Sequence, residues 1–215
     1  TDNLRLQFYD PGNLLAADAC LPECAPREVH RQTFVRDVPL AAFAGLERGP
    51  VTVARSDEGD WIELRFDGPG EEDYRVWRIP RRGYRLELEA QGLDGLRLAA
   101  GRGFRPPPAD GFGVWLEQPR YLLFDGGEAM VIGLDEPAEA QVTGDWTGFR
   151  NRFWSVMARP AEPSPVQFTS GEGQLDPVLR LEAPGKALSL SLYVGPVEPR
   201  ALRAADPALH GMMYA

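Results

Sequence analysis

The stretch from Asp145 to Pro160 constrains the fold more than any other part of the chain. Each large ring buries roughly 150–250 Å² on folding, so a run this aromatic belongs inside a core. Its spacing fits both a helical stripe and a strand, but Thr143-Gly144 before it and Pro160 at its end favour a strand. We therefore expect a central core strand here, with the rest of the chain arranged around it. Its large apolar side chains are Trp146, Phe149, Phe153, Trp154, Val156 and Met157.

Composition limits the classes of protein that this chain can belong to. It has 215 residues, which is enough to bury a large core in one domain. Its 23 glycines and 20 prolines suit many short strands joined by turns better than a helical bundle. The net charge of −9 argues against nucleic acid as a partner and against adhesion to an anionic membrane by charge alone.

Short segments of alternating apolar residues recur along the chain, separated by turn signals rich in Gly, Pro and Asp. An acidic turn is expected at Ser56–Asp60, and helical segments are expected at 199–205 and, more irregularly, at 207–215. This pattern predicts an all-β sandwich over residues 1–198, followed by a C-terminal helical segment over residues 199–215. The expected strands include 4–8, 51–53, 61–66, 74–79, 84–90, 96–98, 114–116, 121–124, 130–134, 166–169, 178–181 and 188–194.

The chain has two cysteines, Cys20 and Cys24, in a proline-rich loop. A local disulfide between them is expected in an oxidising compartment. Two alternatives remain: a zinc site that includes His30, which lacks a fourth nearby ligand, and two free thiols in a reducing compartment. The acidic cluster at Ser56–Asp60 lacks the spacing of a calcium loop, so we expect a solvated turn and no metal there.

The inventory of catalytic residues is poor. The only histidines, His30 and His210, lie near opposite ends of the chain. The sequence has no Gly-x-Ser-x-Gly elbow, no His-Glu-x-x-His pair and no phosphate-binding loop. We therefore expect a protein that is not an enzyme and that needs no cofactor.

Two motifs in the C-terminal half resemble a known family. The first is Asp145-Trp146-x-Gly148-Phe149-x-Asn151-x-Phe153-Trp154, which runs on to Pro160. The second is Pro184-Gly185, followed by a strand that ends in Tyr193-Val194-Gly195-Pro196, with Arg200 and Leu202 in the next segment. In this order they resemble the large periplasmic domain of bacterial YidC membrane insertases.

This resemblance implies a β-supersandwich, similar to galactose-mutarotase folds, that ends in short helices. It implies a periplasmic domain of an inner-membrane protein, tethered by membrane helices outside this sequence. The segment that contains Arg200 and Leu202 is then the link toward a transmembrane helix. The expected partners are the membrane part of the same protein and, further, components of the Sec translocon or nascent membrane proteins.

Other functions stay open on the sequence alone. A sugar-binding or mutarotase-like periplasmic protein would use an exposed aromatic ring, for which Trp61, Trp77 and Trp115 are candidates. A mutarotase would also bring His30 and His210 together beside a carboxylate. A periplasmic chaperone would instead bind an extended peptide by strand addition.

Overall fold

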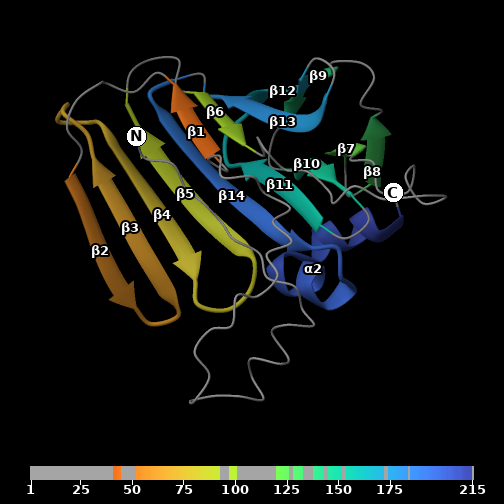
Figure 1. Cartoon of the computed structure of the whole chain (residues 1–215), viewed down its shortest axis with the longest axis horizontal. Helices are drawn as coiled ribbons and strands as arrows, with labels where there is room; N and C mark the ends of the chain where they lie inside the picture. The colour runs from red at the N-terminus through yellow and green to blue at the C-terminus, as the bar shows by residue number, and fades with distance from the viewer. Residues whose placement is uncertain are drawn as a thin grey trace.

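The computed structural model describes residues 41–44, 52–92, 97–100, 120–125, 128–132, 138–142, 145–151, 154–171, 174–183 and 185–214. These residues are mostly β, forming two antiparallel sheets with two short helices at the C-terminal end (Figure 1). The mostly-β class and the short C-terminal helices, both predicted from the sequence pattern, are confirmed.

The larger sheet has nine strands whose order in space differs from their order in the chain. From one edge to the other it runs β2 (Thr52–Glu58), β3 (Trp61–Asp67), β4 (Tyr74–Pro80), β5 (Arg85–Gln91), β14 (Ala187–Pro196), β11 (Trp154–Pro160), β10 (Thr147–Arg150), β7 (Arg120–Asp125) and β8 (Glu128–Ile132). The smaller sheet runs β1 (Ala41–Ala44), β6 (Arg97–Ala100), β13 (Gln174–Glu182), β12 (Ser164–Gly171) and β9 (Ala138–Val142). The helix α2 (Pro199–Ala205) and the 3₁₀ helix η2 (Pro207–Tyr214) follow β14.

The aromatic stretch forms two strands, so the prediction of one central strand there was wrong. β10 and β11 pair as a hairpin in which Phe149 lies opposite Val156. The turn between them is closed by Asn151, whose backbone N–H donates to the Trp154 carbonyl at 2.9 Å. Its side-chain oxygen accepts from the Trp154 N–H at 2.7 Å. The middle strand of the larger sheet is instead β14, between β5 and β11.

Local structure differs from the prediction at three other places. The acidic turn at Ser56–Asp60 is shorter than expected, because β2 continues to Glu58, which pairs with Trp61. Only two residues then turn the chain, and Gly59 provides the positive φ of 55°. The strands expected at 166–169 and 178–181 are longer than predicted, since β12 reaches Gly171 and β13 begins at Gln174. Strand β9 was not predicted, because its sequence AEAQV has few bulky residues.

The first core lies between the two sheets, and it confirms that the aromatic stretch is buried. Phe149 and Val156 of the larger sheet share one cluster with Val166 and Phe168 of β12 and with Leu179 of β13. The rings of Tyr121 and Phe168 face each other across the sheets, with centroids 4.7 Å apart. The two sheets are therefore held together by one continuous apolar layer.

A second core lies on the other face of the larger sheet, under α2 and η2. It makes the burial of β14 uneven along its length. Leu188 and Leu190 alternate with the exposed Ala187 and Ser189 in the first half of the strand, but every residue from Leu190 to Gly195 is buried. The second half of β14 is thus covered on both faces, a pattern more common in parallel sheets.

Candidate functional site

The C-terminal helices dock on the larger sheet through apolar side chains. Leu202 of α2 and Leu209 and Met212 of η2 are fully buried. They pack in one cluster with Leu122, Phe124, Trp146, Met157 and Tyr193, which the sheet contributes from β7, β11, β14 and the residue before β10. Completely burying a leucine or methionine contributes about 1.5–3 kcal/mol, so these three side chains anchor the segment firmly.

A polar clamp secures the junction between the two helices. Asp206, which lies between α2 and η2, forms an ion pair with Arg159 of β11. Its second oxygen accepts from the backbone N–H of Ala208 at 2.9 Å, at the start of η2. The guanidinium of Arg159 also lies over the Trp146 ring, 5.0 Å from the centroid. Arg159 therefore joins the helical segment to both the sheet and the second core.

Arg85 of β5 approaches the same junction from the other side. Its guanidinium donates to the Ala205 carbonyl at 3.2 Å, at the C-terminal end of α2, and lies 3.9 Å from Asp206. A cation is favourable there because the last carbonyls of a helix carry partial negative charge. We call the set Arg85, Arg159 and Asp206 the helix clamp.

The helix clamp is continuous with a row of polar side chains across the sheet. Arg85 donates to Glu87 at 2.7 Å and to the Ser191 hydroxyl at 3.1 Å. That hydroxyl donates in turn to Glu87 at 2.8 Å. The three groups satisfy one another, so Arg85 is held in a single orientation toward the helices.

Close approach of small residues completes the docking surface. A Cβ added to Gly148 would lie 2.1 Å from the Val156 carbonyl oxygen and 3.0 Å from the Met157 sulfur. A Cβ added to Gly195 would lie 2.6 Å from the Cβ of Tyr84. Glycine is therefore needed at both positions, because any larger residue would clash with Met157 or with Tyr84.

Tyr193 lies at the centre of this surface and is fully buried. Its hydroxyl donates to the Pro196 carbonyl at 2.6 Å, and its ring meets the Tyr84 ring edge-on at 6.3 Å. Burial, with smaller contributions from Tyr84 and Glu198, raises the pKa of the Tyr193 phenol well above its usual value. The phenol is therefore held neutral as a hydrogen-bond donor.

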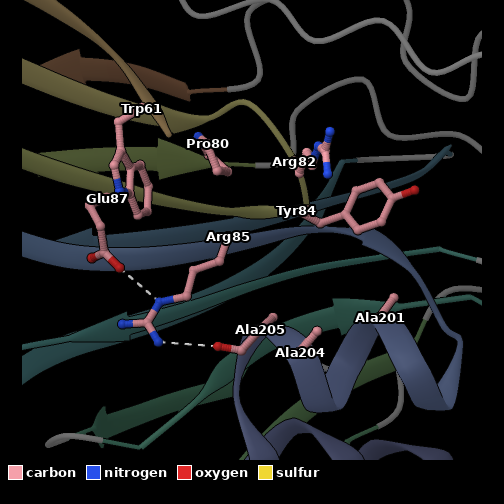
Figure 2. Close-up of a pocket in the computed structure, with 10 residues that line it drawn as sticks. Trp61, Pro80, Arg82, Tyr84, Arg85, Glu87, Ala201, Ala204 and Ala205 are labelled. Carbon is pink, nitrogen blue, oxygen red and sulfur yellow. Dashed lines mark hydrogen bonds and ion pairs between the residues drawn. The ribbon is translucent and has the colours of Figure 1, made fainter. Parts of the chain in front are cut away.

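A pocket of about 550 Å³ lies beside the helix clamp, between strands β3–β5 and one side of α2 (Figure 2). Trp61 and Tyr84 lie at its two ends, 38% and 39% exposed, and Ala201 and Ala204 of α2 form part of its wall. Arg82 also lines it and forms no hydrogen bond or ion pair within the described part of the chain. The pocket therefore combines exposed rings with a free cation.

The structure brings the two family-like motifs together at the helix-docking surface. Trp146 from the first motif, Tyr193 from the second and Leu202 from the C-terminal link belong to the same buried cluster, the second core. Gly148 and Gly195 lie in the strands beneath it. Trp146 and Tyr193, which are 47 positions apart in the sequence, thus serve one packing interface.

Other residues of the motifs lie elsewhere. Phe149 belongs to the core between the sheets, and Asn151 closes the β10–β11 turn. Asp145 and Trp154 are half-buried, as is Pro196, while Pro160 is buried at the end of β11; Gly185 and Arg200 are exposed. Cys20, Cys24, Phe153 and Pro184 lie outside the described residues, as do His30 and Trp115.

Sequence reasoning missed the polar half of the site. Arg85, Arg159 and Asp206 were not singled out, although one signal was present. Arg159 is a lone charge near the end of the apolar strand WSVMARP, and a charge in such a strand usually has a partner. Its partner is 47 positions away, which the sequence does not reveal.

Three of the residues considered for sugar binding or mutarotase activity, Trp61, Trp77 and His210, lie within the described part of the chain. Trp77 is buried at 2% exposure, so of the two described candidates only Trp61 can offer a ring to a ligand. His210 lies on η2, where it contacts Arg203 at 2.8 Å and meets the Tyr214 ring edge-on. Within the described ranges, no three His, Cys, Asp or Glu side chains gather as a metal site.

The fold and the site together define a class: a mostly-β domain with a helical segment clamped to one face of its larger sheet. Neither a family model nor a curated protein matches the chain. In the part of the chain that the structure describes, no helix has the length and apolar character needed to cross a bilayer. The helical segment at the C-terminal end is therefore the feature on which a functional proposal rests.

Proposed function

We propose that this chain is a non-catalytic periplasmic domain of a YidC-type membrane insertase, with its two sheets closed as a β-supersandwich. In this role it assists membrane-protein insertion or folding. It does so by docking partners near the membrane part of the same protein. The partners are components of the Sec translocon or nascent membrane proteins.

One observation carries the proposal: the two motifs that resemble the family converge on the surface that holds the C-terminal helices. Trp146 and Tyr193 belong to the sheet side of this surface, and Leu202 packs in the same buried cluster from the helix side. The two motifs, which are separate in the sequence, therefore share a physical role. A domain that must transmit its position to a membrane helix needs such a rigid connection.

The clamp makes the connection stiff. Leu202 and Leu209 provide burial, and Asp206 fixes the angle between α2 and η2 through its contacts with Arg159 and Ala208. A segment held by both apolar and charged contacts moves with the sheet as one body. In the proposed role, the helices act as a rigid mechanical link.

The location is tested on the protein produced from its own gene in cells. The proposal expects it in the inner-membrane fraction after alkaline carbonate extraction, and it expects protease to cut it in spheroplasts but not in intact cells. Recovery of the whole protein in the soluble cytoplasmic fraction would contradict the proposal.

The link is tested in the same cells with point variants, because deleting the helices would uncover Trp146 and Met157. The double variant Arg159→Met/Asp206→Asn removes the clamp and keeps the apolar anchors. We expect insertion of a reporter membrane protein to fall with this variant and to be unchanged with Arg78→Met, a control in an ion pair distant from the helices. Equal insertion by both variants would exclude a role for the clamp.

A further inference from the structure

The pocket beside α2 offers more hydrogen-bond donors than acceptors. Arg82 has five N–H groups and no partner among the described residues. Three of the five donors of Arg85 are occupied by Glu87, Ser191 and Ala205, which leaves two, one of them on the nitrogen that lies 3.9 Å from Asp206. Glu87 is the acidic group in the wall, and both of its oxygens already accept hydrogen bonds. A ligand that fits this wall must be rich in acceptors.

The ends of the pocket offer flat apolar surface. Trp61 and Tyr84 are each more than a third exposed; Pro80 lies between them, and the alanines of α2 lie on the opposite side of the pocket (Figure 2). An aromatic ring gives an apolar face, and the indole N–H and the phenol give a polar edge. This combination matches a molecule with both a flat C–H face and polar groups around its rim.

The strands that carry the pocket do not present a free backbone edge. β3 lies between β2 and β4, β4 lies between β3 and β5, and β5 lies between β4 and β14. An extended peptide bound by strand addition needs unpaired backbone groups, which these three strands lack. Strand addition therefore does not account for binding at this pocket, and the side chains in its wall carry the recognition.

We propose that this pocket binds an acidic saccharide: a pyranose ring that carries a carboxylate. The C–H face of the ring stacks on Trp61, and the carboxylate accepts two parallel hydrogen bonds from Arg82. The ring hydroxyls reach the free N–H groups of Arg85 and the Tyr84 hydroxyl. The volume of about 550 Å³ is within the range of small-molecule pockets.

This binding site is independent of the insertase proposal and involves no reaction. It needs α2 in its docked position, because Ala201 and Ala204 belong to the wall. Ligand binding would therefore stabilise the docked helices by mass action. Saccharide recognition by Trp61 and Arg82 would hold or fail whatever the cellular location of the domain.

The test is an NMR titration of the ¹⁵N-labelled chain with methyl glucuronide and with methyl glucoside. These probes differ in that one carries a carboxylate where the other carries a hydroxymethyl group. We expect the glucuronide to shift the Trp61 indole and Gly83 amide signals, with a Kd on the order of 1 mM. The glucoside is expected to bind at least about fivefold more weakly, because it lacks the charged hydrogen bonds to Arg82.

Two variants locate the interaction. Trp61→Ala should weaken glucuronide binding by about tenfold, since an aromatic contact of this kind contributes up to about 1.5 kcal/mol. Arg82→Gln should abolish the preference for glucuronide and leave the weak binding of the glucoside. Tyr214→Ala, which removes a ring that is 82% exposed and outside the pocket, is the matched control and should change nothing.

Three results would overturn the proposal. The first is the absence of any shift at Trp61 and Gly83 with the glucuronide. The second is equal affinity of the unsubstituted chain for both probes, which would exclude recognition of the carboxylate by Arg82. The third is unchanged binding in a Trp61→Ala variant whose spectrum shows that it is folded.

Discussion

The outer face of the larger sheet carries helices over one half and charged side chains over the other. Over β7, β10, β11 and the end of β14, the second core buries Met157 and Tyr193 completely. Over β3, β4 and β5, Arg78 instead contacts Glu63 at 3.0 Å and Glu89 at 2.7 Å. Those three side chains are 37–43% exposed. One sheet therefore uses two means of covering its outer face.

The difference is visible in the sequences of the strands. β5 alternates between buried and half-buried residues along its whole length, as expected for a strand with one face in the core. In β14 the alternation stops at Leu190: the exposed Ala187 and Ser189 are followed by an unbroken buried run from Leu190 to Gly195. A break in period two toward continuous burial thus marks where the helices begin to cover the sheet.

The largest effect is expected from removing an apolar anchor of the helices. Leu202→Ala should lower the free energy of unfolding by about 3 kcal/mol, because the cavity lies in a fully buried cluster. Guanidinium unfolding followed by tryptophan fluorescence measures this loss. Ala204→Gly, an exposed change on the same helix, is the control and should cost about 1 kcal/mol from helix propensity alone. Equal losses would mean that Leu202 does not anchor the segment.

Gly148→Ala should destabilise the same half of the sheet by about 2–3 kcal/mol. The new methyl group meets the Val156 carbonyl and the Met157 Cα, which are backbone atoms and cannot rotate away. Gly185→Ala is the matched control, because its Cβ has no atom within 4 Å. The control should change the unfolding midpoint little, within about 0.5 kcal/mol. An unaffected Gly148→Ala protein would show that β10 and β11 are not packed this closely.

Asp206→Asn tests the charged part of the docking surface. The variant keeps the hydrogen bond to Ala208 but loses the charge that pairs with Arg159. Asp206 is 12% exposed, so the pair is partly desolvated, and we expect a loss of about 1–2 kcal/mol. A double-mutant cycle with Arg159→Met isolates the coupling between the two side chains. A coupling energy near zero would show that the ion pair between Arg159 and Asp206 does not stabilise the docked helices.

Tyr193→Phe should cost about 1 kcal/mol at neutral pH, because the hydrogen bond to Pro196 is lost inside the protein. The raised pKa of Tyr193 also predicts a pH dependence. Stabilisation by the neutral phenol is complete below the ordinary tyrosine pKa near 10, and it falls as the pH rises from there toward the folded value. Unfolding curves between about pH 9 and 11 should show this slope, and Tyr193→Phe should flatten it. Tyr214→Phe, an exposed change, should leave it unaltered.

The sequence predicted what depends on local pattern. The period-two runs placed β3, β4, β5 and β14 closely, and Pro199 marked the start of α2. The sequence pattern did not predict features that depend on contacts between residues far apart in the chain. The aromatic stretch turns back at Asn151 because Phe149 and Val156 pair across a hairpin, and an apolar run alone does not show such a turn. The clamp was missed for the same reason, since Arg85 and Asp206 meet only after the sheet has assembled.

The smallest effect is expected in the half of the sheet without helices. Arg78→Met keeps the aliphatic stem of the side chain and removes its two ion pairs. Hydrogen bonds from Arg78 to Glu89 and Glu63 raise the pKa of its guanidinium, but all three groups are well solvated. We expect a loss of about 0.5 kcal/mol that shrinks further in 1 M salt, because exposed pairs are screened. Arg159→Met should cost at least twice as much and depend less on salt, since its partner Asp206 is shielded. Equal losses of stability and equal salt dependence for the two variants would contradict this expectation. They would show that the helices do not shield the ion pair beneath them from solvent.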